Sequence, residues 1–161
     1  MLQRNSFNEE SIAYLANIRS LTHLALGLSA TPLTDVAMEH IGKIHSLEFL
    51  DLQHSMVTDS GMAHLAGLTN MEQLWIQGAS GLEGRSITDE SVNVFMGMKR
   101  LQRLTAFETQ LTDAGIRRIA ALPNLRRMEI SSGAVSEQLA TELKKDYPAL
   151  TIWIRRIEPN K

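Results

Sequence analysis

The sequence contains no cysteine and no long apolar run, and it has only a few aromatic residues. The two absences exclude particular kinds of covalent link, metal site and membrane segment. Without cysteine it forms neither disulfides nor thiolate metal sites. No stretch reaches the roughly 18 consecutive apolar residues that a membrane-spanning helix needs. The first residues, Met1 to Ser6, also lack the apolar core of a secretory signal. We therefore expect a cytoplasmic protein that makes no contact with a membrane.

The charge is close to balanced overall but is unevenly distributed along the chain. The net charge is −2, yet residues 1–98 carry 4 Lys/Arg against 11 Asp/Glu, and residues 99–161 carry 12 against 7. The two parts therefore have net charges of −7 and +5, which sum to −2. In an elongated molecule this difference would produce a dipole along the long axis that orients an approaching partner.

A repeat dominates the sequence. The dipeptide Thr-Asp recurs, and an apolar residue follows each Thr at a constant distance of thirteen positions. The pairs are Thr34 and Leu47, Thr58 and Met71, Thr88 and Leu101, and Thr112 and Leu125. Asn8 keeps the same distance to Leu21, whereas Ser136 precedes Leu150 by one position more. Such periodicity indicates a stack of similar structural units.

Each unit has two halves with different periodicities. The first half reads apolar-x-x-apolar-x-apolar, and its last two apolar positions alternate as in a strand. The triplets are Leu21/Leu24/Leu26, Leu47/Leu50/Leu52, Met71/Leu74/Ile76, Leu101/Leu104/Ala106 and Leu125/Met128/Ile130. The second half has helical spacing, as in Met62/Leu65/Leu68 and Ile116/Ile119/Leu122. Each repeated Thr is a good helix N-cap, and the Asp after it favours the positive end of the helix dipole.

A small residue stands three positions after each repeated Thr. These residues are Ala37, Gly61, Ser91 and Gly115. We interpret the small side chains as room for the neighbouring helix to approach. One unit cannot bury its apolar face alone, so stacked units are expected to share a continuous core.

The pattern resembles the leucine-rich-repeat family, in the version written L-x-x-L-x-L-x-x-T-x-L-T-D-x-G-L. Residues 101–116 match it nearly position for position, and the resemblance covers about residues 7–154. At the position that holds cysteine in related repeats, this chain has Ser29, Ser55, Ala79, Thr109 and Gly133. The resemblance implies an α/β solenoid, a right-handed arc with a parallel sheet on the concave face and helices on the convex face. It also implies protein–protein interaction and nothing narrower, and no F-box is present to suggest a ubiquitin-ligase role.

We expect a single domain, residues 1–161, with a half-repeat or cap at 7–20 and a C-terminal edge strand at 150–157. The repeats are expected to start near residues 21, 47, 71, 101 and 125. An insertion after the third predicted strand forms a glycine-rich rim loop at residues 78–86, in which Gly78, Leu82, Glu83 and Arg85 are candidate contact residues. A tolerated surface insertion is an equally good interpretation.

The side chains that alternate with the buried ones should line the concave face. Three large aromatic residues, Phe49, Trp75 and Phe107, stand among them and are expected to form a diagonal stripe spanning roughly 16 Å. Exposed aromatics beside arginines are typical of a binding hot spot. The candidate partner-binding residues are Phe49, Asp51, Trp75, Gln77, Arg103, Phe107, Arg127 and Glu129. Alternatively, the aromatic side chains merely cover the sheet.

The sequence offers no catalytic or metal-binding pattern. The five histidines have no ligand spacing with carboxylates, and Gly78, Gly81 and Gly84 are not followed by the Lys-Ser/Thr of a phosphate loop. We therefore predict no enzyme activity and no cofactor, and a role as a protein–protein interaction module with an unidentified protein partner. The alternatives are a structural subunit or C-terminal segment that docks through its charged ends, including self-assembly. Nucleic-acid binding by the arginines is less favoured, because the chain is acidic overall.

Overall fold

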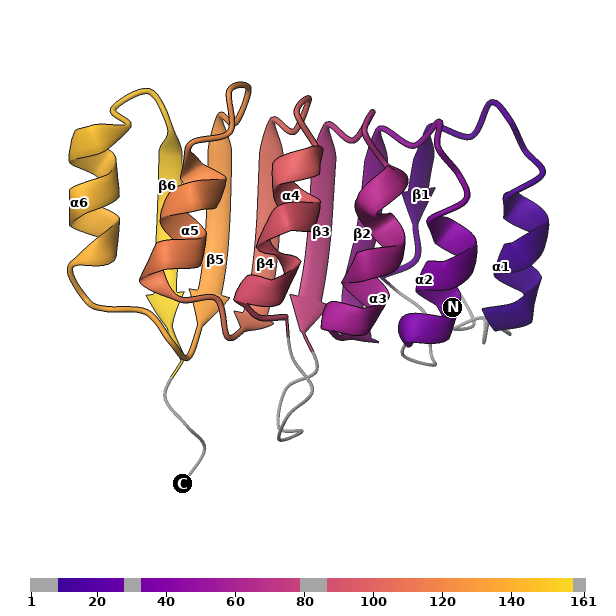
Figure 1. Cartoon of the computed structure of the whole chain (residues 1–161), viewed down its shortest axis with the longest axis horizontal. Coiled ribbons are helices and arrows are strands. Elements are labelled where there is room, and N and C mark those ends of the chain that lie inside the picture. The colour runs from indigo at the N-terminus through magenta and orange to yellow at the C-terminus, as the bar shows by residue number, and fades with distance from the viewer. Residues whose placement is uncertain (1–8, 28–32, 79–86, 158–161) are drawn as a thin grey trace, which may run out of the picture.

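The computed structural model describes residues 9–27, 33–78 and 87–157. Six parallel strands form one sheet in chain order, and the helices lie along one side of it (Figure 1). The strands are β1 (His23–Ala25), β2 (Phe49–Val57), β3 (Gln73–Gly78), β4 (Arg103–Thr109), β5 (Arg127–Ser132) and β6 (Thr151–Arg156). The helices are α1 (Glu9–Leu15), α2 (Asp35–Ile41), α3 (Asp59–His64), α4 (Val92–Gly97), α5 (Asp113–Ala120) and α6 (Leu139–Asp146). Short 3-10 helices, η1 (Leu65–Gly67) and η2 (Asp89–Ser91), follow α3 and precede α4.

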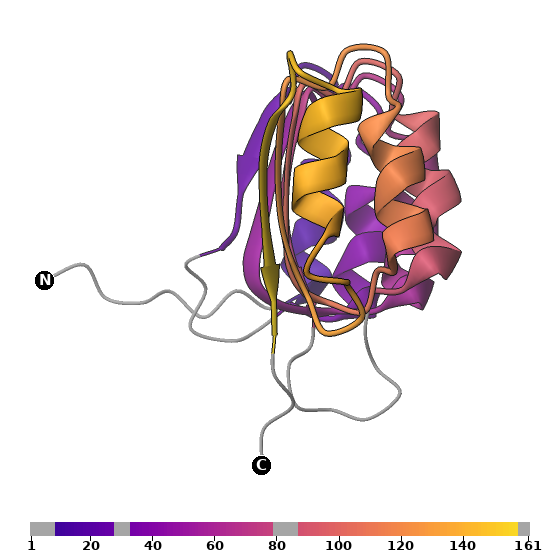
Figure 2. The same ribbon diagram turned by 90° about the vertical axis from the view of Figure 1, so that its left-hand side faces the viewer.

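The architecture is the predicted leucine-rich-repeat solenoid. Each strand is followed by a helix and then by the next parallel strand, so the chain winds in a right-handed coil (Figure 1). The helices are spread more widely than the strands in Figure 1, which makes the sheet the inner, concave side of the arc. Figure 2 shows the helices gathered on one side of the sheet, so in the described part of the chain the concave face carries no helix.

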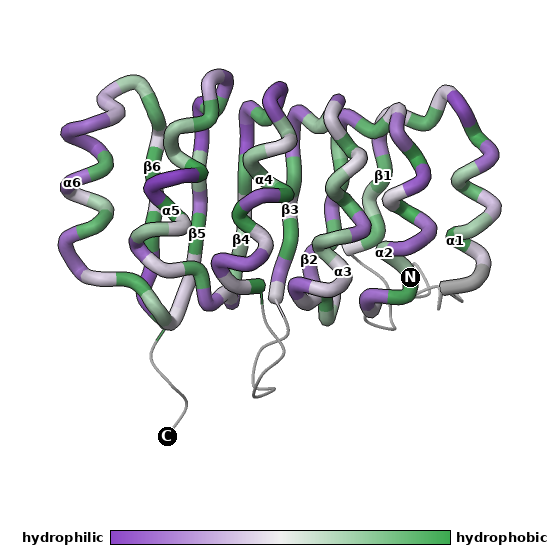
Figure 3. The backbone as a smooth tube through the Cα atoms, in the orientation of Figure 1, coloured by the Kyte–Doolittle hydropathy of each residue, from purple (hydrophilic) through white to green (hydrophobic). Residues whose placement is uncertain are grey.

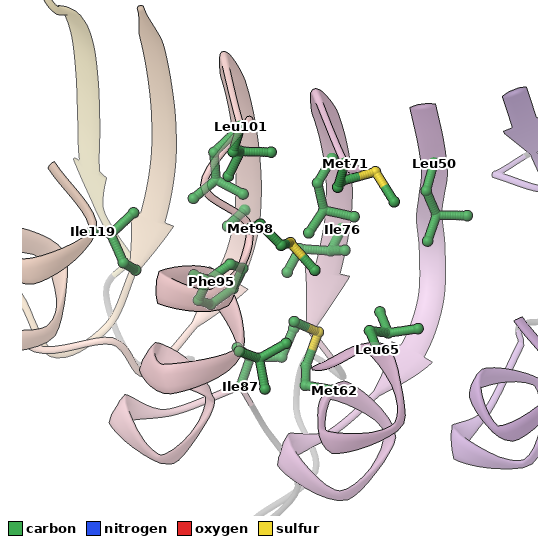
Figure 4. Close-up of a cluster of buried hydrophobic side chains, with 14 of the residues drawn as sticks. Leu50, Met62, Leu65, Met71, Ile76, Ile87, Phe95, Met98, Leu101 and Ile119 are labelled. Carbon is green, nitrogen blue, oxygen red and sulfur yellow. The ribbon is translucent and has the colours of Figure 1, made fainter. Parts of the chain in front are cut away.

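The strands form because apolar residues alternate with polar ones, and the apolar side chains face the helices. Leu50, Leu52, Leu74 and Ile76 are all fully buried there. Figure 4 shows how the core fills the space between sheet and helices, with Phe95 among the buried side chains of α4. Figure 3 shows the matching pattern in the helices, where short hydrophilic and hydrophobic stretches alternate along the tube because one face is polar and the other apolar. None of the described helices is long and apolar enough to cross a membrane.

Helix α1 lies within the segment 7–20 that was predicted to be a half-repeat or cap. Helix α1 ends at Leu15, and Ile12 is 1% exposed and belongs to the core. Ile18 lies beyond the helix and is 46% exposed. Among the described residues, no strand precedes α1, so nothing there pairs with β1 on its outer side.

The repeated Thr residues cap their helices as predicted. Thr34, Thr58 and Thr88 each accept a hydrogen bond from the backbone N–H two residues later, and Thr112 accepts one from Gly115. The Asp beside each Thr also has a second role, because it accepts two hydrogen bonds from the next repeat. Asp35 binds Thr58, Asp59 binds Thr88, Asp89 binds Thr112 and Asp113 binds Ser136, each through one N–H and one hydroxyl. These contacts join successive helix N-termini into a continuous Thr–Asp ladder.

The ladder also explains the small residues three positions after Thr. A Cβ added to Gly61 would lie 2.2 Å from Asp35 Oδ1, and one added to Gly115 would lie 2.2 Å from Asp89 Oδ1. At the corresponding position Ser91 fits, because its hydroxyl donates a hydrogen bond to Asp59 Oδ1. The first turn of the neighbouring helix does approach here, and the carboxylate of the ladder occupies the space.

Two strands contain an irregularity that the sequence did not predict. The register shifts between Leu52 and Val57 in β2 and between Ala106 and Thr109 in β4. His54 and Glu108 adopt left-handed conformations there, with φ of 61° and 54°. The freed backbone N–H groups bind side chains of the next strand, His54 to Gln77 Oε1 and Glu108 to Ser131 Oγ.

Candidate functional site

The strand register places the predicted concave residues in straight columns across the sheet. The first column contains His23, Phe49, Gln73, Arg103, Arg127 and Thr151. The second contains Ala25, Asp51, Trp75, Thr105, Glu129 and Trp153. The third column lies two residues further along the strands. In it Gln77 pairs with Phe107, and Ser131 pairs with Arg155. The columns predicted from alternation are therefore confirmed, and they extend to the final strand β6.

The three predicted aromatic residues separate into two groups. Phe49 packs edge-on against Trp75, with ring centroids 5.4 Å apart, and also stacks with His23 at 5.7 Å. Phe107 packs edge-on against Trp153 of β6, with ring centroids 5.9 Å apart. Edge-to-face contacts at this separation are favourable and hold the rings in place. The register keeps the three residues on the predicted diagonal, and their ring contacts divide them between two aromatic clusters.

A hollow of about 390 Å³ lies between the two clusters. Its lining consists of Gln53, Trp75, Arg103, Leu104, Thr105, Phe107, Arg127 and Glu129. Thr105 occupies the middle of β4 and is flanked in the register by Trp75 on β3 and Glu129 on β5. The hollow exists because a small side chain stands here among large ones.

The two arginines of the hollow differ in whether an acidic side chain binds them. Arg127 donates from Nε to Glu129 Oε1, which fixes both side chains. Arg103 is exposed, and its guanidinium forms no hydrogen bond or ion pair within the described part of the chain. The arginines are neighbours in the first column, so the lining carries two cations and one anion. The hollow therefore has an excess of positive charge at the end where β4 and β5 begin.

Asp51 and Gln77, which were also predicted to contact a partner, are held by the protein itself. Asp51 Oδ1 accepts a hydrogen bond from the backbone N–H of Gln53 at 2.9 Å. A Cβ on Gly27 would lie 2.7 Å from the same oxygen, so Asp51 leans toward β1 and away from the hollow. Gln77 supports the irregular turn at His54. Both side chains are half-buried and accept hydrogen bonds from backbone N–H groups of β2.

The predicted rim loop lies almost entirely outside the described residues. Gly78 ends β3 and is buried, whereas Leu82, Glu83 and Arg85 are not among the residues that the structure describes. Their proposed contact role therefore stays a prediction.

The predicted contact residues did not include Trp153, Gln53 or Thr105, although the alternation placed Gln53 and Thr105 on the concave face. Trp153 is 47% exposed and contacts Phe107 from the edge strand. The repeat pattern contained the signal, since Trp153 occupies the same column as Glu129 once β6 is aligned with β5. Thr105 was not predicted to contact a partner, because a small side chain does not by itself indicate a hollow.

The described residues contain no group of three or more His, Asp or Glu side chains placed to hold a metal ion. The site therefore offers aromatic surfaces, arginine donors and a carboxylate. These groups suit recognition of another molecule.

The sequence matches no protein-family model and no curated protein. Among solved structures, the fold is similar to that of internalin C2 from Listeria monocytogenes, with a TM-score of 0.64 and 22% sequence identity. That likeness covers 96% of this chain but 57% of internalin C2, so the chain spans little more than half of its length. Internalin F of the same bacterium has a TM-score of 0.46 and 15% identity over 91% of this chain and 51% of its own. The architecture and the similarity to internalin C2 together establish that the chain folds as a leucine-rich-repeat solenoid.

Proposed function

We propose that the chain is a non-enzymatic protein-binding module that receives a partner protein on its concave face. The observation that carries this proposal is the hollow between the Phe49–Trp75 and Phe107–Trp153 pairs. Aromatic side chains held in place by neighbours lose little entropy on binding and supply large contact areas. Arg127, fixed by Glu129, adds an oriented donor at the edge of the hollow.

The size of the concave face suits such a role. A standard protein–protein interface buries about 800 Å² on each side. Six adjacent strands about 4.8 Å apart offer a surface of that order. The residues expected to contribute most binding energy are Trp75 and Phe107, which line the hollow from β3 and β4.

Nucleic-acid binding is less favoured because several arginines are occupied by acidic or amide neighbours. Arg100 bridges to Glu72 at 2.6 Å, and Arg117 contacts Glu142 and, at 3.9 Å, Asp146. Such pairs on the surface do not form one basic stripe that follows a phosphate backbone.

The proposal is tested by affinity capture from a lysate of the source organism. The parent chain and a Trp75→Ala/Phe107→Ala variant are used side by side after their melting curves have been compared. We expect one protein to be retained by the parent and lost by the variant. A Tyr14→Ala/Val36→Ala variant is the matched control, because Tyr14 and Val36 are exposed apolar residues on α1 and α2. It should retain the same protein as the parent.

Equal retention by the parent and the Trp75/Phe107 variant would contradict binding at the concave face. Loss of the captured protein on raising the salt concentration, with no effect of the aromatic substitutions, would instead favour docking through the oppositely charged ends, because salt screens charges.

A further inference from the structure

The hollow above Thr105 has two chemically different ends. Trp75 and Phe107 form an apolar end, whereas Arg103 and Arg127 lie in the first column at the start of β4 and β5. Arg103 and Phe107 are four residues apart on one strand, which corresponds to about 13 Å. The strands β3 and β5 that flank β4 are about 10 Å apart. Along β4 the hollow therefore extends from a cationic end to an apolar end.

The cationic end has donors that the protein does not use. Arg103 has no hydrogen-bond or ion-pair partner among the described residues. Arg127 uses Nε for Glu129, and its remaining N–H groups donate to nothing in the described part of the chain. A guanidinium group has five N–H donors and prefers carboxylates. An anionic group is therefore the complement of this end.

Trp75 pairs with Thr105, which lies two residues along β4 from Arg103, so the distance from Arg103 to the space above Thr105 matches the repeat of an extended peptide. Side chains two positions apart in a strand point the same way and are about 6.7 Å apart. A carboxylate that reaches Arg103 and an apolar side chain between Trp75 and Phe107 would thus belong to residues i and i+2 of one segment. The intervening side chain would point away from the sheet.

From this arrangement we propose that the hollow recognises an extended acidic segment of a partner protein, in which an Asp or Glu stands two positions from a large apolar residue. The proposal rests on the proposed function and adds the chemistry of the bound segment. The carboxylate binds Arg103 and the free donors of Arg127, and the apolar side chain contacts Trp75 and Phe107.

The test uses N-acetyl-Phe-Ser-Glu-amide and its uncharged counterpart N-acetyl-Phe-Ser-Gln-amide, each also in reversed order. Binding is followed through the indole signals of Trp75 in an NMR titration of the full chain. The chain has only two tryptophans, so Trp153→Phe assigns the Trp75 signal while keeping an aromatic contact for Phe107. We expect the Glu peptide, in at least one order, to bind at least about threefold more tightly than the Gln peptide at low salt. Raising the salt concentration should reduce that preference.

Two arginine variants show which residue causes the preference for the Glu peptide over the Gln peptide. Arg103→Gln should abolish it, and the exposed position of Arg103 makes unfolding an implausible cause. Arg118→Gln removes the same charge from α5, where Arg118 binds Asn93 at 2.9 Å, and should leave the preference unchanged. Equal binding of the Glu and Gln peptides to the parent chain would overturn the proposal. So would equal binding by N-acetyl-Glu-amide, since the hollow would then be a simple anion site.

The two proposals fail in different ways. Loss of a captured protein in the Trp75→Ala/Phe107→Ala variant, together with no preference for the Glu peptide, would leave the proposed function standing and overturn the acidic specificity. A preference that depends on Arg103, without any protein lost by the aromatic variant, would support the chemistry of the hollow and contradict the proposed function.

Discussion

The carboxylate of Asp59 accepts hydrogen bonds from both the backbone N–H and the hydroxyl of Thr88, at 2.9 and 2.7 Å, although 29 positions separate the two residues. The same hydroxyl accepts a hydrogen bond from the N–H of Glu90 and so caps the next helix. One Thr therefore serves its own helix as an acceptor and the preceding repeat as a donor. This double use explains why the dipeptide Thr-Asp is repeated rather than either residue alone.

Removal of one carboxylate should destabilise the stack. In Asp59→Ala, the donors of Thr88 and Ser91 lose their charged acceptor. Hydrogen bonds to charged groups contribute about 1.5–3 kcal/mol each, and water replaces part of that in this half-buried site. We expect the free energy of unfolding to fall by about 2–4 kcal/mol, measured by urea denaturation. Glu90→Ala is the control and should change it by less than about 0.5 kcal/mol, because Glu90 is exposed.

Two glycine substitutions should have opposite effects. Alanine favours helices over glycine by up to about 1 kcal/mol, so propensity alone predicts that both are stabilising. In Gly115→Ala the new Cβ would lie 2.2 Å from Asp89 Oδ1 and would displace it from Thr112, so we expect a loss of about 1–3 kcal/mol. In Gly97→Ala the nearest atom lies 3.9 Å away, so stability should stay unchanged or rise. Thermal unfolding of both variants checks the contrast, and a Gly115→Ala variant more stable than the parent would contradict the ladder.

Glycine at the irregular position of β4 should increase stability. Glu108 has φ of 54°, and its Oε2 is a buried atom that lacks a hydrogen-bond partner among the described residues. A left-handed conformation costs a residue other than glycine about 1–2 kcal/mol. Glu108→Gly should therefore raise the free energy of unfolding by about 0.5–1 kcal/mol after the entropy of glycine in the unfolded chain is counted. His54→Gly, at φ of 61°, should act in the same direction, and a marked loss in both variants would show that the conformation is not strained.

Filling the hollow should weaken binding without affecting folding. Thr105→Leu inserts a larger side chain between Trp75 and Glu129, in the space that the bound segment would occupy. Forcing extra atoms into an occupied site costs about 1–3 kcal/mol, so we expect the dissociation constant for the captured protein to rise at least about fivefold. Thr105→Val keeps the volume and should bind as the parent does. Calorimetric titration of the three proteins measures the difference, and equal affinities would place the partner elsewhere.

The repeat, the helix caps and the concave columns could be predicted from the sequence because each depends on residues at fixed spacing. The alternation that buries Leu50 and Leu52 also places the half-buried Phe49 on the opposite face, so one pattern determines both faces of the sheet. The contacts between repeats could not be predicted in the same way. The hydrogen bonds that Thr88 donates to Asp59 depend on how closely two helices approach. The capping role of Thr88 was already a sufficient reason for a threonine at this position, so nothing in the sequence indicated a second role.

The candidate site was predictable in its members but not in its shape. Trp75, Arg103 and Phe107 followed from their columns, and the structure places them around one hollow. The division of the aromatics into two pairs depends on side-chain orientation, and on Trp153 of the last strand. Asp51 was predicted to contact a partner, yet its hydrogen bond to the N–H of Gln53 turns it toward the backbone. Local bonds of this kind follow from geometry rather than from residue type.

Site-specific photo-crosslinking is the most direct test of binding at the concave face, because it reports where a partner lies. A photoreactive p-benzoyl-phenylalanine is introduced in place of Gln53, at the lining of the hollow, and separately in place of Ala63, an exposed residue of α3. If the partner binds at the concave face, irradiation in the lysate joins a discrete protein to the chain from position 53 and not from position 63. A crosslink from position 63 alone, or from both positions with equal yield, would contradict binding at the concave face.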